Sequence, residues 1–289
     1  MLPLTHLIIA AIALSSPAEA LAKSKSETSS VVSIRAKQGE VFYFSVPADP
    51  EAESALGRFR GRTTPFFRTE DGRNFGALVG VDLADPPSKQ DLQVEISEKG
   101  GAMKQLHYSV QVVSAHFPTQ KLNVPQNYVD LDDETSKRVE EEQEEILQSL
   151  NKVTTQRLWS GRFIMPVDGK ISGSFGRRRI INGQSRSPHS GEDINAPHGT
   201  EVHATNEGVI ALVGDFFFSG KSVILDHGLG LYSMYFHLDA VDVAEGEKVQ
   251  KGAILGKVGA TGRATGPHLH WGMRIDGARV NPLSILNVQ

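Results

Sequence analysis

The chain has 289 residues, a formal net charge of −4 and no cysteine. Its length predicts two domains of ordinary size, and 39% hydrophobic with 22% charged residues is typical of a folded soluble protein. The lack of cysteine excludes a disulfide framework, a thiolate zinc site and a cysteine nucleophile. The slightly acidic balance argues against a nucleic-acid-binding protein, which needs a basic face.

A short apolar run opens the chain at residues 4–14, and a Ser-Ser-Pro sequence at 15–17 ends it. The Ala-Glu-Ala triplet at 18–20 has the small–x–small pattern of a signal-peptidase site. The run is too short to span a bilayer, which takes about 20 apolar residues. We therefore expect a signal peptide over residues 1–20, export to the periplasm or bacterial cell envelope, and no membrane span in the mature chain. A buried N-terminal helix is the alternative.

The segment that follows is expected to form a β-rich module. Residues 21–30 are polar and predict a flexible lead-in. Residues 31–118 contain short apolar or alternating runs separated by turns. The runs expected to form strands are Val31–Ile34, Val41–Val46, Leu56–Phe59, Ala77–Val81, Leu92–Ile96 and Tyr108–Val112. Strands at this spacing predict a small immunoglobulin-like β-sandwich that acts as a spacer or binding module.

Residues 119–155 are expected to link this module to a second domain. Residues 130–150 carry nine acidic and two basic side chains, with apolar residues near helical spacing. Asp132 or Asp133 can cap the start of a helix, and acidic residues suit its first turn. We expect a charged, solvated α-helix that bridges the two domains. An acidic docking element is the alternative.

The C-terminal part, residues 156–289, is rich in glycine and in strand-forming residues, and it shows no long helical period. Strands are expected at Val209–Val213, Ser222–Leu225 and Leu231–Phe236. A compact antiparallel β-sheet domain is the expected fold of this part. The whole chain is therefore predicted to be mostly β.

Seven of the ten histidines lie between His189 and His270. His189 and Asp193 are four residues apart, and Gly191 between them allows a bend that aims both side chains at one point. His268 and His270 are i and i+2, so on a strand they face the same side. Two imidazoles and one carboxylate form a donor set that suits catalytic zinc, with a fourth position left for water.

Three segments carry these residues, with the sequences HSGED at 189–193, YFHL at 235–238 and GPHLHW at 266–271. In this order and at these distances they resemble the LytM/lysostaphin-type zinc peptidoglycan endopeptidases. The resemblance covers roughly residues 162–285, and the β-rich N-terminal part resembles that of envelope members more loosely. It implies a zinc metallopeptidase fold for residues 156–289.

The resemblance also assigns roles to five residues. It implies that His189, Asp193 and His270 bind one zinc ion per chain, and that His237 and His268 are the catalytic histidines. All five positions are occupied as in the family, which favours a working enzyme. The expected function is hydrolysis of peptide cross-links in bacterial peptidoglycan, with its stem peptides as substrate. A non-catalytic module that activates another cell-wall hydrolase is the alternative, and protein regulators stay open.

Four further residues are candidates for contact with the substrate. Arg177 and Arg178 belong, with Arg179, to a basic run before the site that can meet anionic stem-peptide carboxylates, and a solvated loop is the alternative for this run. Asn182 follows the same run. His227 ends a β run, where a turn or strand-end role is the alternative.

Overall fold

Strands make up most of the regular structure, as the sequence predicts. The computed structural model describes residues 33–123, 126, 130–152 and 154–288. The expected signal peptide, the lead-in at 21–30 and the start of the first expected strand at 31–32 lie outside these residues. Within them, no helix is long and apolar enough to cross a membrane.

The N-terminal part contains two sheets that share one apolar core. Its strands are β1 (Ser33–Lys37), β2 (Val41–Pro47), β3 (Ala52–Phe59), β4 (Arg62–Pro65), β5 (Phe67–Arg68), β6 (Asn74–Gly80), β7 (Ser88–Glu98) and β8 (Met103–Val113). One sheet has the order β1-β8-β7-β3-β4, and the other has the order β2-β6-β5. Alternate residues such as Phe59 in β3 and Val79 in β6 are buried in the shared core. The six expected strands are present, and an immunoglobulin-like class for this part stays a prediction.

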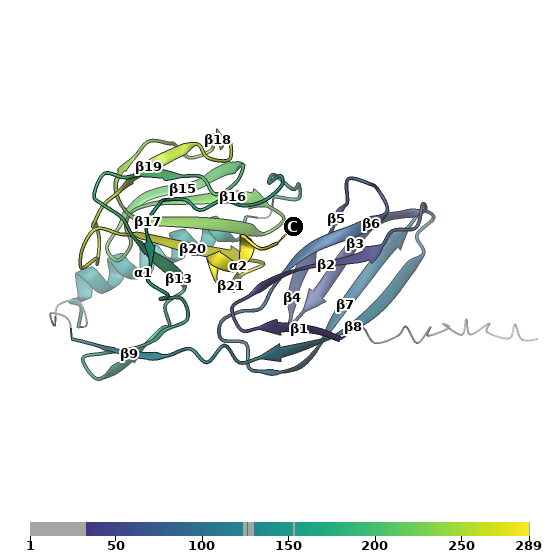
Figure 1. Cartoon of the computed structure of the whole chain (residues 1–289), viewed down its shortest axis with the longest axis horizontal. Coiled ribbons are helices and arrows are strands. Elements are labelled where there is room, and N and C mark those ends of the chain that lie inside the picture. The colour runs from purple at the N-terminus through teal and green to yellow at the C-terminus, as the bar shows by residue number, and fades with distance from the viewer. Residues whose placement is uncertain (1–32, 124–125, 127–129, 153, 289) are drawn as a thin grey trace, which may run out of the picture. The chain divides into compact units, whose positions relative to one another are not determined.

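The C-terminal part is built on a ten-stranded antiparallel sheet (Figure 1). Its strands are β10 (Lys170–Ile171), β13 (Gly191–Asn195), β14 (Glu201–His203), β15 (Gly208–Phe216), β16 (Gly220–Gly228), β17 (Leu231–Val241), β18 (Lys248–Val249), β19 (Ile254–Val258), β20 (Leu269–Ile275) and β21 (Ala278–Arg279), followed by α2 (Pro282–Ile285). The central order β13-β20-β17-β16-β15 places the histidine-bearing segments on neighbouring strands. Leu231, Tyr235 and Trp271 are fully buried in the core of this sheet.

The linker contributes a strand that the sequence did not suggest. Strand β9 (Thr119–Leu122) pairs in parallel with β11 (Arg178–Ile181), and β11 pairs antiparallel with β12 (Gln184–Arg186). The β11–β12 connection is the two-residue turn Asn182-Gly183, with positive φ at both residues. Positive φ at both positions is the geometry of a type I′ hairpin, for which Asn-Gly is the favoured pair.

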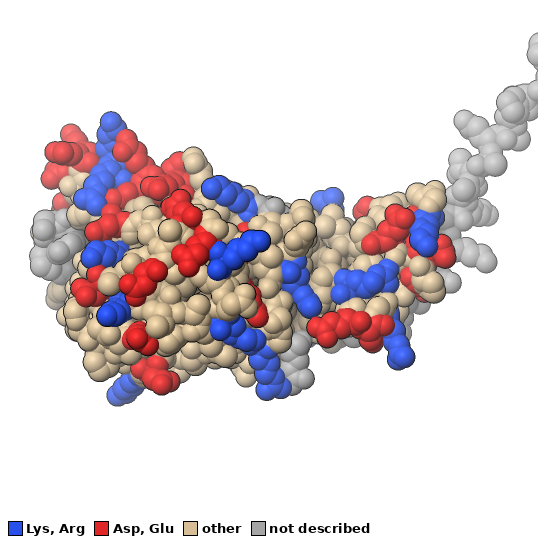
Figure 2. Space-filling model, turned by 90° about the horizontal axis from the view of Figure 1, so that it is seen from above, with Lys and Arg blue, Asp and Glu red and all other residues tan. Residues whose placement is uncertain are grey.

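The linker helix α1 (Asp133–Leu150) begins as expected, because the Asp132 carboxylate accepts a hydrogen bond from the Thr135 N–H at 2.7 Å. The expected solvated helix between two domains is not what the structure shows. The helix packs along β15, with Ile146 and Leu150 against the apolar cluster beneath that strand. The Glu142 carboxylate also accepts from the Phe217 N–H at 2.8 Å. Acidic side chains gather over the part of the molecule that contains α1 (Figure 2).

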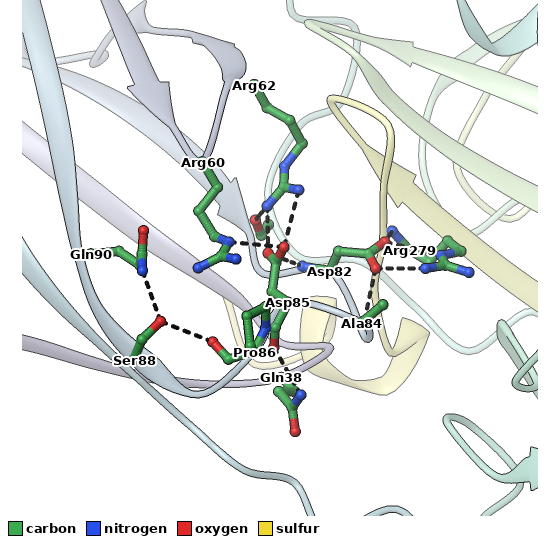
Figure 3. Close-up of polar contacts among 11 residues, drawn as sticks. Gln38, Arg60, Arg62, Asp82, Ala84, Asp85, Pro86, Ser88, Gln90 and Arg279 are labelled. Carbon is green, nitrogen blue, oxygen red and sulfur yellow. Dashed lines mark hydrogen bonds and ion pairs between the residues drawn. The ribbon is translucent and has the colours of Figure 1, made fainter.

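Contacts of β2, β6 and the loop after β6 with the C-terminal part join the two parts into one unit. The Asp82 carboxylate accepts hydrogen bonds from the Arg279 backbone N–H at 2.7 Å and from its Nη2 at 2.7 Å (Figure 3). Asp85, three residues further along, forms ion pairs with Arg60 and Arg62. Apolar contact adds to these polar contacts, because β2 and β6 contribute buried side chains to the core of the C-terminal sheet.

Candidate metal and catalytic site

Pairing of β13 with β20 places two of the predicted metal ligands side by side. Asp193 and His270 are directly opposite each other in the antiparallel register. Gly191 lies beside them, and a Cβ atom at this position would stand 2.5 Å from Nε2 of His270. Glycine is therefore required here because the imidazole occupies the space that a side chain would take.

His189 completes the group from the loop before β13. Its Nε2 lies 2.8 Å from Nδ1 of His270 and 3.2 Å from Oδ1 of Asp193. Nδ1 of His270 lies 3.0 Å from the same oxygen. His189 and His270 are buried, and Asp193 is partly buried. The three side chains thus converge on one point, as the sequence predicts.

The donor set and its spacing fit zinc. Two imidazole nitrogens and one carboxylate oxygen face each other, and at most one proton can lie between the two nitrogens. Ligands about 2.0–2.1 Å from a tetrahedral zinc ion lie roughly 3.3 Å apart, so the separations of 2.8, 3.0 and 3.2 Å found here need to widen only by a few tenths of an ångström to admit the ion. Three protein ligands leave a fourth position open, which is typical of catalytic zinc sites.

The charges of the group suit a cation. Burial alone would raise the pKa of Asp193, but hydrogen bonds and charge from His189 and His270 hold it well below its usual range. Burial lowers the pKa of His270. An ionised carboxylate beside a neutral imidazole is the protonation state in which these side chains bind a metal.

Two further histidines lie next to this group. The His268 ring is 4.8 Å from the His237 ring between centroids, and Nε2 of His268 lies 3.9 Å from Oδ1 of Asp193. In each ring Nδ1 lies within 2.9 Å of a backbone carbonyl, Gly266 O for His268 and Thr261 O for His237. A carbonyl can only accept, so Nδ1 carries a proton in both rings, and in the neutral form of either ring Nε2 keeps the lone pair.

The backbone at His237 is unusual, with a φ of 64° in the left-handed region. Its N–H donates to Ser219 O at 2.9 Å, which holds this conformation at the end of the β16–β17 pairing. Such conformations are uncommon outside glycine and concentrate at functional sites. Burial, with a contribution from His270, lowers the pKa of His237 to about 4, so this ring is neutral near pH 7.

The basic run before the site divides into three different environments. Arg177 donates from Nε to Gly173 O at 3.1 Å and from Nη2 to Ser172 O at 3.0 Å, so it ties down its own loop. The side chain of Arg178 is exposed to solvent, and Asn182 occupies the hairpin turn described above. Substrate contact by Arg177, Arg178 or Asn182 stays a prediction.

His227 does not reach a substrate surface. It is fully buried, with Nδ1 2.7 Å from Glu207 O and Nε2 2.8 Å from the Ser233 hydroxyl. Burial lowers the pKa of this ring to about 4. The expectation that His227 contacts the substrate is therefore wrong for this fold, because both nitrogens are used inside the core. The alternative, a structural role at a strand end, agrees with its position.

Arg179 belongs to the basic run that is predicted to contact stem-peptide carboxylates, but only Arg177 and Arg178 are named as candidate site residues. Arg179 is partly buried, and its charge acts on Asp193 and on His270. The sequence contains three adjacent arginines, and their order alone does not indicate which one faces the predicted metal ligands. That depends on the register of β11 with β9 and β12.

The C-terminal domain is similar in sequence to known peptidases. Residues 187–282 match the model of peptidase family M23. The DD-carboxypeptidase/endopeptidase Mpg of Neisseria meningitidis is 43% identical over 116 residues, which are 40% of this chain and 27% of Mpg. The peptidoglycan DD-endopeptidase ShyA of Vibrio cholerae is 38% identical over 121 residues, 41% of this chain and 28% of ShyA. The match thus spans about a quarter of the length of these curated relatives.

A solved structure extends the similarity to most of the chain. A Pseudomonas aeruginosa protein assigned to peptidase M23 shares 34% sequence identity with a TM-score of 0.66. The alignment covers 84% of this chain and 92% of the Pseudomonas chain, so it reaches beyond the histidine-bearing domain. This chain therefore belongs to peptidase family M23.

Proposed function

We propose that this protein is an exported, zinc-dependent endopeptidase that hydrolyses peptide cross-links of bacterial peptidoglycan. The observation that carries the proposal is the convergence of His189, Asp193 and His270 on one point, with two neutral-tautomer histidines beside them. The similarity to Mpg and ShyA supports peptidoglycan as the substrate. A cell-envelope location follows from such a substrate and from the expected signal peptide.

In this proposal His189 Nε2, Asp193 Oδ1 and His270 Nδ1 hold the zinc ion. When bound, zinc would supply the Lewis acidity that polarises a peptide carbonyl and acidifies water. The buried ligand atoms lie in a region of low dielectric, where this polarisation is stronger than in bulk water. The stacked ring of Phe236, 5.5 Å from His270 and nearly parallel to it, holds the imidazole plane in place.

The two remaining histidines move protons. We assign the base role to His268, because its Nε2 carries a lone pair and lies near Asp193. His268 takes a proton from the attacking water at Nε2. His237 has the same tautomer and is neutral near pH 7, so its Nε2 can donate to the oxyanion only after it has taken up a proton. The proton that His268 removes from water is the one available for this, and it ends on the leaving amine when the C–N bond breaks. The Gly266 and Thr261 carbonyls fix both rings in the required orientation.

The test is digestion of purified cell-wall sacculi by the mature chain, with released peptides read by mass and zinc content read by elemental analysis. We expect the wild type to release cleaved cross-links, and a chelator to abolish this. His270→Ala should lose both zinc and cleavage. His268→Ala should keep its zinc, and its rate should fall by about 10²–10⁴-fold. His198→Ala changes an exposed histidine of the same domain and should behave as the wild type.

Two results would contradict the proposal. Cleavage that resists the chelator would exclude a zinc mechanism. A wild type that binds one zinc ion per chain and releases nothing would favour the alternative, a module that regulates another cell-wall hydrolase.

A further inference from the structure

Arg179 lies on the strand that borders the metal ligands. It sits in the middle of β11, opposite Gln120 of β9 in the parallel pair and opposite Arg186 of β12 in the antiparallel pair. Side chains alternate along a strand, so Arg179 shares its face with the buried Ile181, while Arg178 lies on the other face and is exposed. The register therefore turns one arginine of the run towards the protein interior.

The charge of Arg179 reaches the metal ligands. Burial lowers the pKa of Arg179, while the carboxylate of Asp193 raises it. Arg179 in turn contributes to the lowered pKa of His270. A cation in this position does not help to hold a metal ion, since the two positive charges repel each other. Its presence needs another explanation.

The guanidinium of Arg179 has no anion of its own. Among the described residues no hydrogen bond or ion pair joins it to another side chain, and its Nε is buried without a partner. Asp193 is engaged by both metal-binding histidines. The neighbouring buried carboxylate, Glu192, accepts from the N–H groups of Ser174 and Phe175. Partial burial of a cation without an anionic partner carries a desolvation cost, and an anion that comes from outside would offset it.

The cross-strand neighbour strengthens this argument. Arg186 stands directly opposite Arg179, and like charges at opposed positions of an antiparallel pair destabilise it. An anion at this face would meet the positive charge of both guanidinium groups. A guanidinium binds a carboxylate with two parallel hydrogen bonds, a geometry that lysine cannot reproduce.

We propose that Arg179 binds a free carboxylate of the substrate peptide next to the scissile bond, and so selects anionic peptides. This inference rests on the proposed function and names the group on the substrate that the site recognises. Arg179 is a substrate-binding residue here, distinct from the metal ligands and from the two catalytic histidines.

The test uses two synthetic cross-linked peptides that differ at one position beside the scissile bond. One carries a free carboxylate and the other carries the carboxamide. We expect the zinc-loaded wild type to prefer the acid in kcat/KM by at least about tenfold, the effect of a charge-assisted hydrogen bond. Arg179→Gln should lose about 10- to 100-fold on the acid and little on the amide, which brings the ratio near one. Arg179→Lys should recover part of the preference.

Three comparisons keep this result specific. Zinc content should stay at one per chain in every variant, which shows that the metal ligands are intact. Arg178→Gln tests the competing assignment on the exposed face of the same strand, because Arg178 is itself a predicted contact for stem-peptide carboxylates. If Arg179 is the residue that binds the carboxylate, this variant keeps the acid preference. Arg162→Gln removes an exposed arginine elsewhere in the domain and controls for net charge.

The proposal is overturned if Arg179→Gln keeps the acid preference, if it slows both peptides equally, or if Arg178→Gln is the variant that loses the preference. Failure of the proposed function is read separately, as a wild type that cleaves neither peptide. In that case we measure the Kd of the acid peptide and of the amide peptide, once with the zinc-loaded wild type and once with zinc-loaded Arg179→Gln. The two acid-to-amide Kd ratios then test the proposal without any cleavage. Loss of an acid preference in the variant supports Arg179 as the anion site, and equal Kd ratios reject it.

Discussion

The turn between β20 and β21 holds a carboxyl group, Asp276, that is buried against the N-terminal strands. Asp276 and Gly277 both have positive φ, so the turn is a two-residue hairpin of the Asp-Gly kind. Oδ2 of Asp276 is buried and has no partner among the described residues. Burial raises the pKa of this carboxyl to about 7, although Thr64 and Arg62 partly oppose the shift. The folded protein therefore favours the protonated form.

This shift predicts how stability depends on pH. The folded pKa lies above the usual value of 3.8, so the unfolded chain releases this proton first as the pH rises. The contribution of Asp276 to the free energy of unfolding should therefore fall between about pH 4 and pH 7, by up to about 4 kcal/mol, and stay level above that range.

Asp276→Asn keeps the shape and the turn without the charge. We expect this variant to match the wild type near pH 4 and to exceed its stability by about 1–4 kcal/mol at pH 8. The measurement is urea unfolding across this pH range, with the exposed Asp168→Asn as control. A variant that gains nothing at pH 8 would show that the folded carboxyl ionises without cost.

At this same scale, the sequence indicates the predicted metal ligands and leaves the substrate contacts open. The spacing of His189 and Asp193 and the i, i+2 pair of His268 and His270 limit which side chains can meet. The resemblance to the zinc endopeptidases then selects His270 as the third predicted ligand. His227 could not be placed, because an Asp-His-Gly sequence at a strand end says nothing of the core around it. Arg179 could not be distinguished from Arg178, because the choice between adjacent residues depends on strand register.

At the scale of elements, long runs with a clear period were predictable, and short strands were not. The alternating strands and the helix α1 lie close to their expected positions. Strand β9 is four residues long, largely polar, and pairs with a partner more than fifty residues further along the chain. Neither its length nor its composition distinguishes it from a loop. The Asn182-Gly183 turn was the available signal for the β11–β12 hairpin.

Because β9 pairs with the C-terminal part, the residue at which a shortened chain begins should affect its stability. The Phe117 ring, just before β9, packs edge-on against Phe175 at 5.8 Å, and β9 pairs with the strand that carries Arg179. A chain that begins at Gln156 loses these contacts and α1. We expect it to be less stable than a chain that begins at Ala115 by roughly 2–4 kcal/mol, the scale of a few partly buried apolar side chains.

Denaturant unfolding of the two shortened chains measures this difference, with the mature chain as reference. The comparison also separates the effect on activity of losing the N-terminal sheets from the effect of losing β9. The chain from Ala115 lacks the N-terminal sheets but keeps β9, whereas the chain from Gln156 lacks both. Equal stability of the two shortened chains would show that β9 contributes nothing to the folded C-terminal part.

At the scale of the whole molecule, the two parts meet through a polar contact that the sequence gives no means of pairing. Asp82 and Arg279 are 197 residues apart and form hydrogen bonds through the Arg279 backbone, Nε and Nη2 (Figure 3). Burial alone would raise the pKa of Asp82, but the Arg279 guanidinium holds it below its usual value. The backbone adds a further link, since the Leu83 N–H donates to Arg279 O at 3.1 Å.

A double-mutant cycle tests whether this pair holds the parts together. Asp82→Ala and Arg279→Ala should each cost about 2–4 kcal/mol in free energy of unfolding, because each leaves a partly buried charge without its partner. The double variant should cost less than the sum by about 1.5–3 kcal/mol. The control cycle uses Glu51 and Lys99, an exposed pair with N···O 3.8 Å, whose coupling should stay below about 0.5 kcal/mol. Additive costs at Asp82 and Arg279 would mean that apolar packing, and not this ion pair, joins the N-terminal sheets to the C-terminal domain.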